Sequence, residues 1–461
     1  MRIFNTQSGK KEELVPIDDK RITMYVCGLT VYDHFHIGHA RTFVFFDFAR
    51  RFLEHIGYEV RFVMNFTDVE DKIIARAAET GEYPLHLSER FIQEYFKDAS
   101  ALHIRKATFH PRATEFIGDM IEFIGGLVEK GFAYAVDGDV YFSVEKVKNY
   151  GRLTKQSLED MRAGARVEVD PKKRYPYDFA LWKSVKEGEI SWDSPWGKGR
   201  PGWHIECSVM SKNLLGDTID IHGGGQDLIF PHHENEILQS ESLTGKKFVN
   251  LWMHVGLLTL NELKMSKSLK NFITMRELLT RHDANAVRYF FLYNHYRKPL
   301  EFSEAALDES SKTFKRLSNA YDLLSSSLGK AKGENREFIS VVEKYKSSFI
   351  EALKDDFNTP DALSHVFEFV RELNKYLEGE TNREALEEAQ KFFRDVEEIF
   401  GFTFGRGISD VSERLMHIII EIRENARKKK DYVTSDLIRD RLKEAGIAIQ
   451  DTPEGPRWKI D

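Results

Sequence analysis

The stretch at residues 25–41 (Tyr-Val-Cys-Gly-Leu-Thr-Val-Tyr-Asp-His-Phe-His-Ile-Gly-His-Ala-Arg) limits the possible folds of this chain more than any other part of it. Residues 21–26 are apolar and β-branched enough for a buried strand, Gly28 predicts the end of that strand, and a helical pattern begins at Gly38. A strand, a turn and a helix in this order are typical of an open α/β sheet, which binds ligands at the carboxyl ends of its strands. We therefore expect Cys27 to lie at such an edge.

The later pattern predicts more strands of the same parallel sheet at residues 59–65, 218–222 and 248–255. The glycines at 223–225 predict a tight turn, and Pro231 is expected to be the first residue of the next helix. The fold class that we expect is therefore α/β, with a Rossmann-type doubly wound parallel sheet.

An insertion is expected to interrupt this sheet. Residues 133–144 alternate around Asp137-Gly138, which predicts a β-hairpin, whereas residues 192–203 hold too many turn formers for a regular element. Helical patterns occur at residues 85–102, 113–130, 304–326, 339–354, 359–378 and 382–400.

The composition excludes several classes of protein. The 461 residues are 41% hydrophobic, enough for several buried cores and too much for a disordered or fibrous chain. Residues 1–11 lack the apolar core of a signal peptide, and we find no apolar run of about 18 residues. With only two cysteines, the chain is expected to be cytoplasmic, without a membrane partner or a disulfide.

The last segment differs in charge from the rest of the chain. Residues 401–461 hold 12 Lys and Arg against 11 Asp and Glu, a net of +1 beside −8 for the other residues. The cations gather at Arg427 and the three lysines after it, and Trp458 lies near the end. Cations for phosphates and a flat ring for a base suit single-stranded RNA loops, although a solvated charged helix is the alternative.

Four distant residues can form a metal site. His232 and Glu236 are four positions apart on a predicted helix and therefore project from one face. Cys27 and Cys207 complete a set of two thiolates, one imidazole and one carboxylate, which suits zinc. His233 is the alternative ligand if the helix phase differs by one residue. Either cysteine taken alone would more often be a packing residue.

Two short motifs predict a phosphate site. His36 and His39 are three positions apart at the start of a predicted helix, where both can donate to phosphate oxygens. Lys264 and Lys267 belong to residues 263–271, which we predict to be a loop that covers a triphosphate. Either motif alone has an ordinary polar turn or solvated loop as its alternative.

These motifs resemble those of a known family. His-Ile-Gly-His at residues 36–39 and Lys-Met-Ser-Lys-Ser at residues 264–268 match the two defining motifs of class I aminoacyl-tRNA synthetases. The metal set is similar to that of the cysteinyl-tRNA synthetase family, and the similarity runs nearly from end to end. Leu29 departs from the pattern, because the family has proline in this turn.

The resemblance implies a reaction and its cofactors. The family ligates L-cysteine to tRNA(Cys) through a cysteinyl-adenylate, with ATP and Mg²⁺ entering together. One Zn²⁺ per chain, held by Cys27, Cys207, His232 and Glu236, would bind the substrate thiol, and a thiolate is a far better zinc ligand than the hydroxyl of serine.

The resemblance also implies further residue roles. The catalytic residues would be His36, His39, Lys264 and Lys267. The ATP-binding residues would be His36, Gly38, His39, Asp227 and Lys267. The residues that contact the substrate cysteine would be Gly28, Thr67, Trp203 and His222. The residues that contact the anticodon would be Arg427 and Trp458.

The expected domains follow from the same resemblance. They are the first half of the catalytic domain (1–110), a connective insertion (111–200), the second half of the catalytic domain (201–255), the Lys-Met-Ser-Lys-Ser loop with a stem-contact region (256–304), a helical bundle (305–400) and an anticodon-binding domain (401–461). We expect a monomer whose partners are tRNA(Cys), L-cysteine and ATP.

Two other functions are compatible with the catalytic half. A ligase of the mycothiol type activates cysteine in the same way and transfers it to an amino sugar, but it lacks a C-terminal RNA-binding module. A catalytically dead, RNA-binding relative would have no need of His36, His39, Lys264 and Lys267 together.

Overall fold

The computed structural model describes residues 1–148, 150–155, 170–185, 189–260, 263–264, 272–334, 336–405, 410–452 and 455–460. The chain forms two compact units, Met1–Phe402 and Thr403–Asp461, and each is described by itself. In the described residues, no helix is both long enough and apolar enough to span a bilayer.

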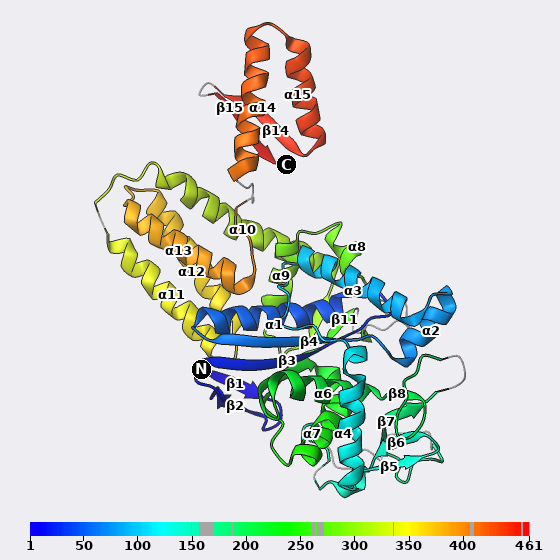
Figure 1. Cartoon of the computed structure of the whole chain (residues 1–461). Helices are drawn as coiled ribbons and strands as arrows, with labels where there is room; N and C mark the ends of the chain where they lie inside the picture. Colours follow the sequence, from blue (N-terminus) through cyan, green and yellow to red (C-terminus); the bar gives the residue numbers. More distant parts are fainter. Residues whose placement is uncertain are drawn as a thin grey trace. The chain divides into compact units, whose positions relative to one another are not determined.

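A parallel four-stranded sheet forms the centre of the first unit (Figure 1). Its strands, in spatial order, are β10 (Val249–Val255), β9 (Ile219–Gly225), β3 (Arg21–Thr30) and β4 (Glu59–Thr67). Helix α1 (Ile37–His55) covers one face, and α6 (Trp203–Leu215) and α7 (Glu234–Thr244) lie on the other. The prediction of a doubly wound α/β sheet is confirmed.

The strand order places a switch point between β3 and β9. The chain runs from β3 to β4 in one direction and from β9 to β10 in the other, and all neighbouring pairs are parallel. The carboxyl ends of β3 and β9 therefore meet where the two halves diverge, which is where open α/β sheets bind their ligands.

The prediction that Gly28 ends the first strand is wrong. Strand β3 continues to Thr30, and its ladder with β4 changes register between Val26 and Leu29. A Cβ atom on Gly28 would lie 1.7 Å from the carbonyl oxygen of Asn65. Glycine is needed here because two backbones approach closely, a use that a sequence does not distinguish from a turn.

The tight turn predicted at Gly223–Gly225 is also wrong. These glycines are the last residues of β9 and pair with Met253–Val255 of β10. A Cβ atom on Gly223 would lie 2.1 Å from the ring of Phe46, so the missing side chain lets α1 pack directly on the strand.

Pro231 does not begin a helix, contrary to prediction. One turn of 3₁₀ helix (Gln226–Leu228) and a π-helical turn (Ile229–His233) precede α7, which begins at Glu234. His232 therefore lies just before the helix that carries Glu236.

Helices α2 (Asp71–Thr80) and α3 (Pro84–Ala101) follow β4. The region of the predicted insertion contains α4 (Ile117–Glu129) and a sheet of β5 (Ala133–Val136), β6 (Asp139–Phe142), β7 (Phe179–Ser184) and β8 (Gly199–Pro201). The hairpin prediction is confirmed, since β5 and β6 pair around Asp137 and Gly138, with φ of 47° and 85°. The prediction that residues 192–203 hold no regular element is wrong at Gly199–Pro201. These three residues form strand β8 because they pair with β7.

The remaining elements of the first unit are β1 (Arg2–Asn5), β2 (Lys10–Glu13), β11 (Leu258–Leu260), β12 (Leu263–Lys264), β13 (Leu300–Phe302), α8 (Met275–Leu279), α9 (Ala284–Leu292), α10 (Glu304–Leu328), α11 (Glu337–Lys354), α12 (Thr359–Leu377) and α13 (Arg383–Phe400). The last four confirm the predicted helices to within three residues at each end. Ser303, Asn358 and Asn382 accept a backbone N–H at the first turns of α10, α12 and α13, as N-cap residues do.

A buried ion pair joins this helical part to the sheet. The guanidinium of Arg288 in α9 lies 2.8 Å from a carboxylate oxygen of Asp47 in α1 and donates to the carbonyl of Phe400, which ends α13. Three elements that are far apart in the sequence are thereby fixed against one another.

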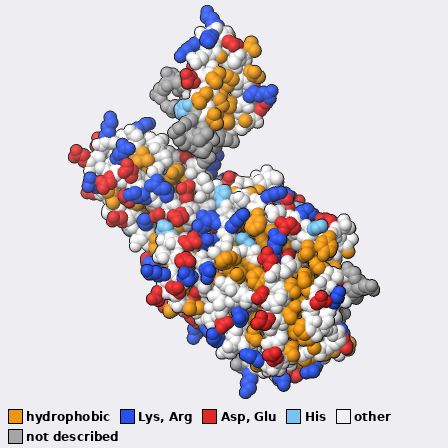
Figure 2. Space-filling view, viewed as in Figure 1, with side chains coloured by type: hydrophobic (Ala, Val, Ile, Leu, Met, Phe, Trp, Pro, Cys, Tyr) orange, Lys and Arg blue, Asp and Glu red, His pale blue; other side chains and the backbone are white. Residues whose placement is uncertain are grey.

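The second unit contains α14 (Asp410–Lys428), α15 (Tyr432–Glu444), β14 (Ile447–Thr452) and β15 (Gly455–Ile460). Met416, Ile420 and Leu442 form its small core. Figure 2 shows apolar side chains gathered on the visible face of this unit.

Candidate active site

The four predicted metal ligands lie together beside the switch point. Cys27 comes from β3, Cys207 from α6, His232 from the turn before α7 and Glu236 from α7, and all four are buried. One ligand atom from each lies within 4.8 Å of the others. The structure thus brings together the residues that the sequence suggested.

The spacing of this cluster fits a tetrahedral metal site. The Cys27 sulfur lies 3.6 Å from the Cys207 sulfur and 3.5 Å from Oε1 of Glu236. Nε2 of His232 lies 3.0 Å from the same oxygen. Ligands at about 2.0–2.3 Å from a tetrahedral zinc are roughly 3.3–3.8 Å apart, so small outward shifts would accommodate the ion.

A second set of ligands shares two members with the first. Cys27 and Glu236 also group with His222 and His233, and the Cys27 sulfur lies 3.3 Å from Nε2 of His233. The alternative ligand His233 is therefore near enough to bind. The first set alone contains both thiols, and thiolates favour zinc.

Two histidines outside both sets contact and orient a histidine of each set. Nδ1 of His232 lies 3.0 Å from Nδ1 of His204. Nδ1 of His233 lies 2.8 Å from Nε2 of His254, and Nδ1 of His254 lies 2.8 Å from the hydroxyl of Thr6. Sequence reasoning missed His204 and His254, because nothing in the chain order indicates which ring a ligand will contact.

The electrostatics of the cluster favour a bound cation. Burial opposes charge on Cys207, yet the hydrogen bond from the Cys27 thiol and the proximity of His232 lower the pKa of Cys207 to about 6. Burial likewise opposes charge on His232, but the Glu236 carboxylate raises the pKa of His232 to about 10. The cluster therefore holds negative charge around a proton that a metal ion can replace.

The residues expected to contact the substrate cysteine border this cluster. Trp203 is 38% exposed and stacks on His232 with ring centres 4.3 Å apart. The hydroxyl of Thr67 donates to Glu206 at 2.6 Å, and the Gly28 amide donates to the side-chain oxygen of Asn65 at 2.9 Å.

His222 lies behind the cluster. Its ring is fully buried, and Nε2 lies 2.8 Å from Oε2 of Glu236. It holds the carboxylate whose other oxygen faces Cys27, so its contact with Glu236 orients a predicted ligand.

Glu206 was not predicted. It is fully buried, burial raises its pKa well above the usual range, and its Oε1 has no hydrogen-bond partner in the described part of the chain. Its position beside Cys207 is the only signal in the sequence, and glutamate is ordinarily exposed.

The two motif histidines lie at the start of α1, but His36 is the N-cap residue and not part of the first turn. Its Nδ1 accepts from the amides of Gly38 and His39 at 3.2 and 3.4 Å. In the neutral ring the proton is therefore on Nε2, which makes that atom a donor. The rings of His36 and His39 stack with centres 3.6 Å apart.

The other predicted nucleotide residues are less fully described. Asp227 is exposed on the 3₁₀ turn that follows β9, close to Gly225. Lys264 belongs to the two-residue strand β12, so the loop prediction for residues 263–271 is wrong at its first two positions. Lys267 lies outside the described residues.

The two predicted anticodon residues lie in the second unit. Arg427 is exposed in the last turn of α14, where its guanidinium is 3.7 Å from Glu424. Trp458 of β15 packs partly against the core of Met416, Ile420 and Leu442. Part of its ring therefore packs in the core of the unit.

Sequence comparisons show which family of proteins this chain resembles. Residues 13–312 match the model for the tRNA synthetases class I (C) catalytic domain, and residues 348–405 match the DALR domain. The chain is 49% identical over 477 residues to the cysteine--tRNA ligase of Heliobacterium modesticaldum, with 100% of this chain and 99% of that protein covered.

Comparison with solved structures gives the same fold. Mycobacterium tuberculosis methionyl-tRNA synthetase in complex with methionyl-adenylate is similar with a TM-score of 0.61 and 16% identity, covering 82% of this chain and 89% of that one. The leucyl enzyme (LeuRS) of Agrobacterium radiobacter K84, in a ternary complex with tRNA, gives 0.63 and 10%, covering 84% and 85%. The catalytic-domain match and the full-length similarity together show that the chain belongs to the cysteine--tRNA ligase family of class I tRNA synthetases.

Proposed function

We propose that this protein ligates L-cysteine to tRNA(Cys) in two steps. The cysteine carboxylate attacks the α-phosphate of ATP and releases pyrophosphate, and the 2′-hydroxyl of the terminal tRNA adenosine then attacks the acyl carbonyl and releases AMP. The observation that carries the proposal is the buried grouping of Cys27, Cys207, His232 and Glu236 beside the switch point. The full-length similarity to a cysteine--tRNA ligase supports it.

The four ligands are proposed to hold one Zn²⁺. When bound, zinc would supply a Lewis acid that prefers the substrate thiolate to the hydroxyl of serine. Trp203, stacked on His232 and partly exposed, borders the space where the cysteine side chain would enter. Thr67 and Gly28, which lie on the two paired strands, are proposed to contact the backbone end of the amino acid.

The start of α1 is proposed to bind the phosphates of ATP, which enters with Mg²⁺. Nδ1 of His36 accepts from two backbone amides, so in the neutral ring the proton is on Nε2, which is the atom that would donate to a phosphate oxygen. We assign His39, Gly38, Lys264 and Lys267 to the same phosphates, and Asp227 to the adenosine. Since Cys27 lies in β3 and His36 follows that strand, one short segment would bring the carboxylate to the α-phosphate.

The second unit is proposed to bind the tRNA anticodon through Arg427 and the exposed face of Trp458. Its exposed cationic residues after α14 supply charge for phosphates. A ligase that transfers cysteine to an amino sugar would have no use for this unit. We also propose that the protein acts as a monomer in the cytoplasm.

Cysteine-dependent exchange of pyrophosphate into ATP tests the first step. We expect exchange with cysteine and none with serine at equal concentration, because the thiol is what the metal cluster would select. Equal exchange with serine would contradict selection by zinc. A lack of exchange with any amino acid would contradict the whole proposal.

A further inference from the structure

The side chain of Arg41 is buried in α1, two residues after the second motif histidine, and the proposed reaction gives it no role. Arg41 is 2% exposed. Burial lowers its pKa to about 10, so the guanidinium is still a cation near neutral pH. A buried cation needs hydrogen-bond acceptors inside the protein, and these acceptors show which segments Arg41 holds together.

Four backbone carbonyls from two connections accept from this guanidinium. Nη1 donates to Gly256 at 2.7 Å and to Leu257 at 2.8 Å, in the connection from β10 to β11. Nη2 donates to Tyr296 at 3.4 Å and to Lys298, in the connection from α9 to β13. The planar fork of arginine reaches both connections at once, whereas the donors of a lysine all come from one nitrogen atom.

The two connections also contact each other where Arg41 holds them. The amide of Gly256 donates to the carbonyl of Tyr296 at 2.8 Å. A Cβ atom on Gly256 would lie 2.5 Å from the carbonyl oxygen of Lys298, so the two backbones are close. Phe45, one helical turn after Arg41, stacks on the ring of Tyr296 with centres 4.2 Å apart. Two successive turns of α1 therefore contact the connection from α9 to β13.

The strands that follow these carbonyls include the one that carries Lys264. Strand β11 begins directly after Leu257 and pairs with β12 so that Thr259 lies opposite Lys264. Strand β13 begins two residues after Lys298 and pairs with the other edge of β11. Because the three strands form one sheet, a displacement of either connection would move the backbone of Lys264 relative to α1.

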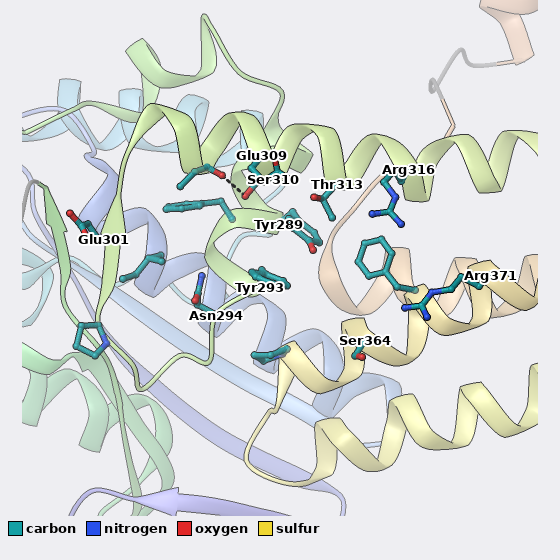
Figure 3. Close-up of a pocket in the computed structure, with 16 residues that line it drawn as sticks. Tyr289, Tyr293, Asn294, Glu301, Glu309, Ser310, Thr313, Arg316, Ser364 and Arg371 are labelled. Carbon is teal, nitrogen blue, oxygen red and sulfur yellow. Dashed lines mark hydrogen bonds between the residues drawn. The ribbon is translucent and has the colours of Figure 1, made fainter.

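A cavity borders the connection from α9 to β13 (Figure 3). Its volume is about 740 Å³, and Asn294, Pro299 and Glu301 line it together with residues of α9, α10 and α12. The part of the connection that faces the cavity lacks close neighbours there, and a segment with few packed contacts is easily displaced. The position of this connection therefore depends more strongly on its contacts with α1.

The chain also returns to the start of α1 beyond the second motif. The amide of Ile37 donates to the carbonyl of Ile273 at 3.1 Å, and the amide of Met275 donates to the carbonyl of Phe35 at 2.8 Å. The segments before and after residues 264–268 are thus both attached close to the two motif histidines.

We propose that Arg41 is a positioning residue for formation of the adenylate. It fixes the sheet of β11, β12 and β13 on α1 and thereby sets the place of Lys264 relative to the histidines proposed to bind the ATP phosphates. This inference rests on the proposed function, because the step that it serves is the proposed attack on ATP. Small displacements of groups that act in the transition state lower kcat steeply.

A double-mutant cycle with Lys264 separates positioning from general stability. Arg41→Lys alone is expected to lower kcat of pyrophosphate exchange at least about tenfold, with KM for cysteine within about twofold of wild type. Zinc content, measured by mass spectrometry, should be unchanged. In Lys264→Ala the same change should lower kcat less than about threefold further, because the group that it positions is absent. Equal losses in the two backgrounds, or full activity of Arg41→Lys, would overturn the proposal.

Arg288→Lys is the matched control. The guanidinium of Arg288 is also fully buried and donates to backbone carbonyls, but these belong to Leu102 and Phe400 and not to the connections that Arg41 holds. We expect Arg288→Lys to lower the melting temperature as Arg41→Lys does and to keep kcat of exchange within about twofold of wild type. A loss of exchange as large as that of Arg41→Lys would show that any buried arginine has this effect, which would overturn the proposal.

Gly256→Ala tests the same contact if Arg41→Lys does not fold. Its Cβ would press on the carbonyl oxygen of Lys298 while Arg41 is kept, so the same loss of kcat and the same dependence on Lys264 are expected. Hydrogen–deuterium exchange gives a readout without substrates: the amides of residues 257–260 and 296–302 should exchange faster in both variants, and those of α6 should not.

Unchanged exchange of these amides in both variants would overturn the proposal, as would an equal increase throughout the sheet of β3, β4, β9 and β10. A wild-type protein without pyrophosphate exchange would instead contradict the proposed function. Full activity of the variants beside an active wild type would contradict only the role of Arg41.

Discussion

The sulfur atoms of Cys27 and Cys207 lie 3.6 Å apart, although 180 residues separate them in the chain. Strand β3 and helix α6 meet only because the insertion leaves the sheet and returns to it on the face opposite α1. Both thiols of the chain thereby face Glu236 and the histidines before it.

Replacement of Cys207 should distinguish the two possible ligand sets. Cys207→Ala removes a member of the Cys27, Cys207, His232 and Glu236 set and leaves the other set intact. We expect purified wild type to hold about one zinc per chain, and the variant to hold almost none, when metal is measured by mass spectrometry. His232→Ala should behave like Cys207→Ala, whereas His233→Ala should retain zinc. Loss in His233→Ala alone would favour the second set.

Substitution of Gly28 should damage the site through the backbone. Gly28→Ala places a Cβ where the Asn65 carbonyl lies at 1.7 Å, so β3 or β4 must move. We expect a lower melting temperature and at least a tenfold loss of pyrophosphate exchange, since a misplacement of about 1 Å can lower the rate roughly a hundredfold. Gly118→Ala is the matched control: it lies in α4 with nothing within 4 Å of the new Cβ and should be neutral or stabilising by about 0.5–1 kcal/mol. Full exchange activity in Gly28→Ala would show that the close approach is not needed.

His110 should make stability depend on pH. Its Nε2 accepts from the amide of Ala107 and its Nδ1 lies 2.9 Å from the carbonyl of Met64, so the folded protein needs the neutral ring. Burial lowers the pKa of His110 from 6.5 to about 4. The unfolded chain binds the extra proton between these values, so stability is full above pH 6.5 and falls as the pH drops toward 4, by about 3 kcal/mol in all.

Melting temperatures at pH 7.5 and 5.0 would test this contribution. His110→Gln cannot titrate and should lose less of its stability between the two pH values than the wild type. An equal loss in both proteins would assign the pH dependence to other groups.

Removal of the second unit should separate the two steps of the reaction. A chain that ends at Phe402 keeps every described residue of the metal cluster and of α1. We expect it to retain pyrophosphate exchange within about threefold. Charging of tRNA should fall at least a hundredfold, because the residues proposed to contact the anticodon and the cations proposed to pair with the RNA phosphates are removed. Normal charging by the shortened chain would refute the role proposed for Arg427 and Trp458.

The sequence predicted the elements better than the uses of glycine. Strands β3, β4, β9 and β10 and the long helices follow from the periodicity of their apolar residues. Gly28 and Gly223 were misinterpreted as turn residues, because a glycine that permits close packing and one that permits a turn are alike in sequence.

The site was predictable where a residue type is rare. Two cysteines in 461 residues directed attention to Cys27 and Cys207. Glu206 and His254 were missed because each acquires its role from burial beside a distant element. A single sequence does not show which distant residues will lie in contact. The choice between His232 and His233 depended on where helix α7 begins. The turn at Ile229–His233 moves that start from the predicted Pro231 to Glu234.

Charging of a tRNA(Cys) transcript with radiolabelled cysteine and ATP tests the central proposal most directly. We predict that full-length protein forms cysteinyl-tRNA(Cys), that serine is not attached, and that a transcript with another anticodon is charged at least tenfold more slowly. Activation of cysteine without transfer to any tRNA would contradict the proposed function.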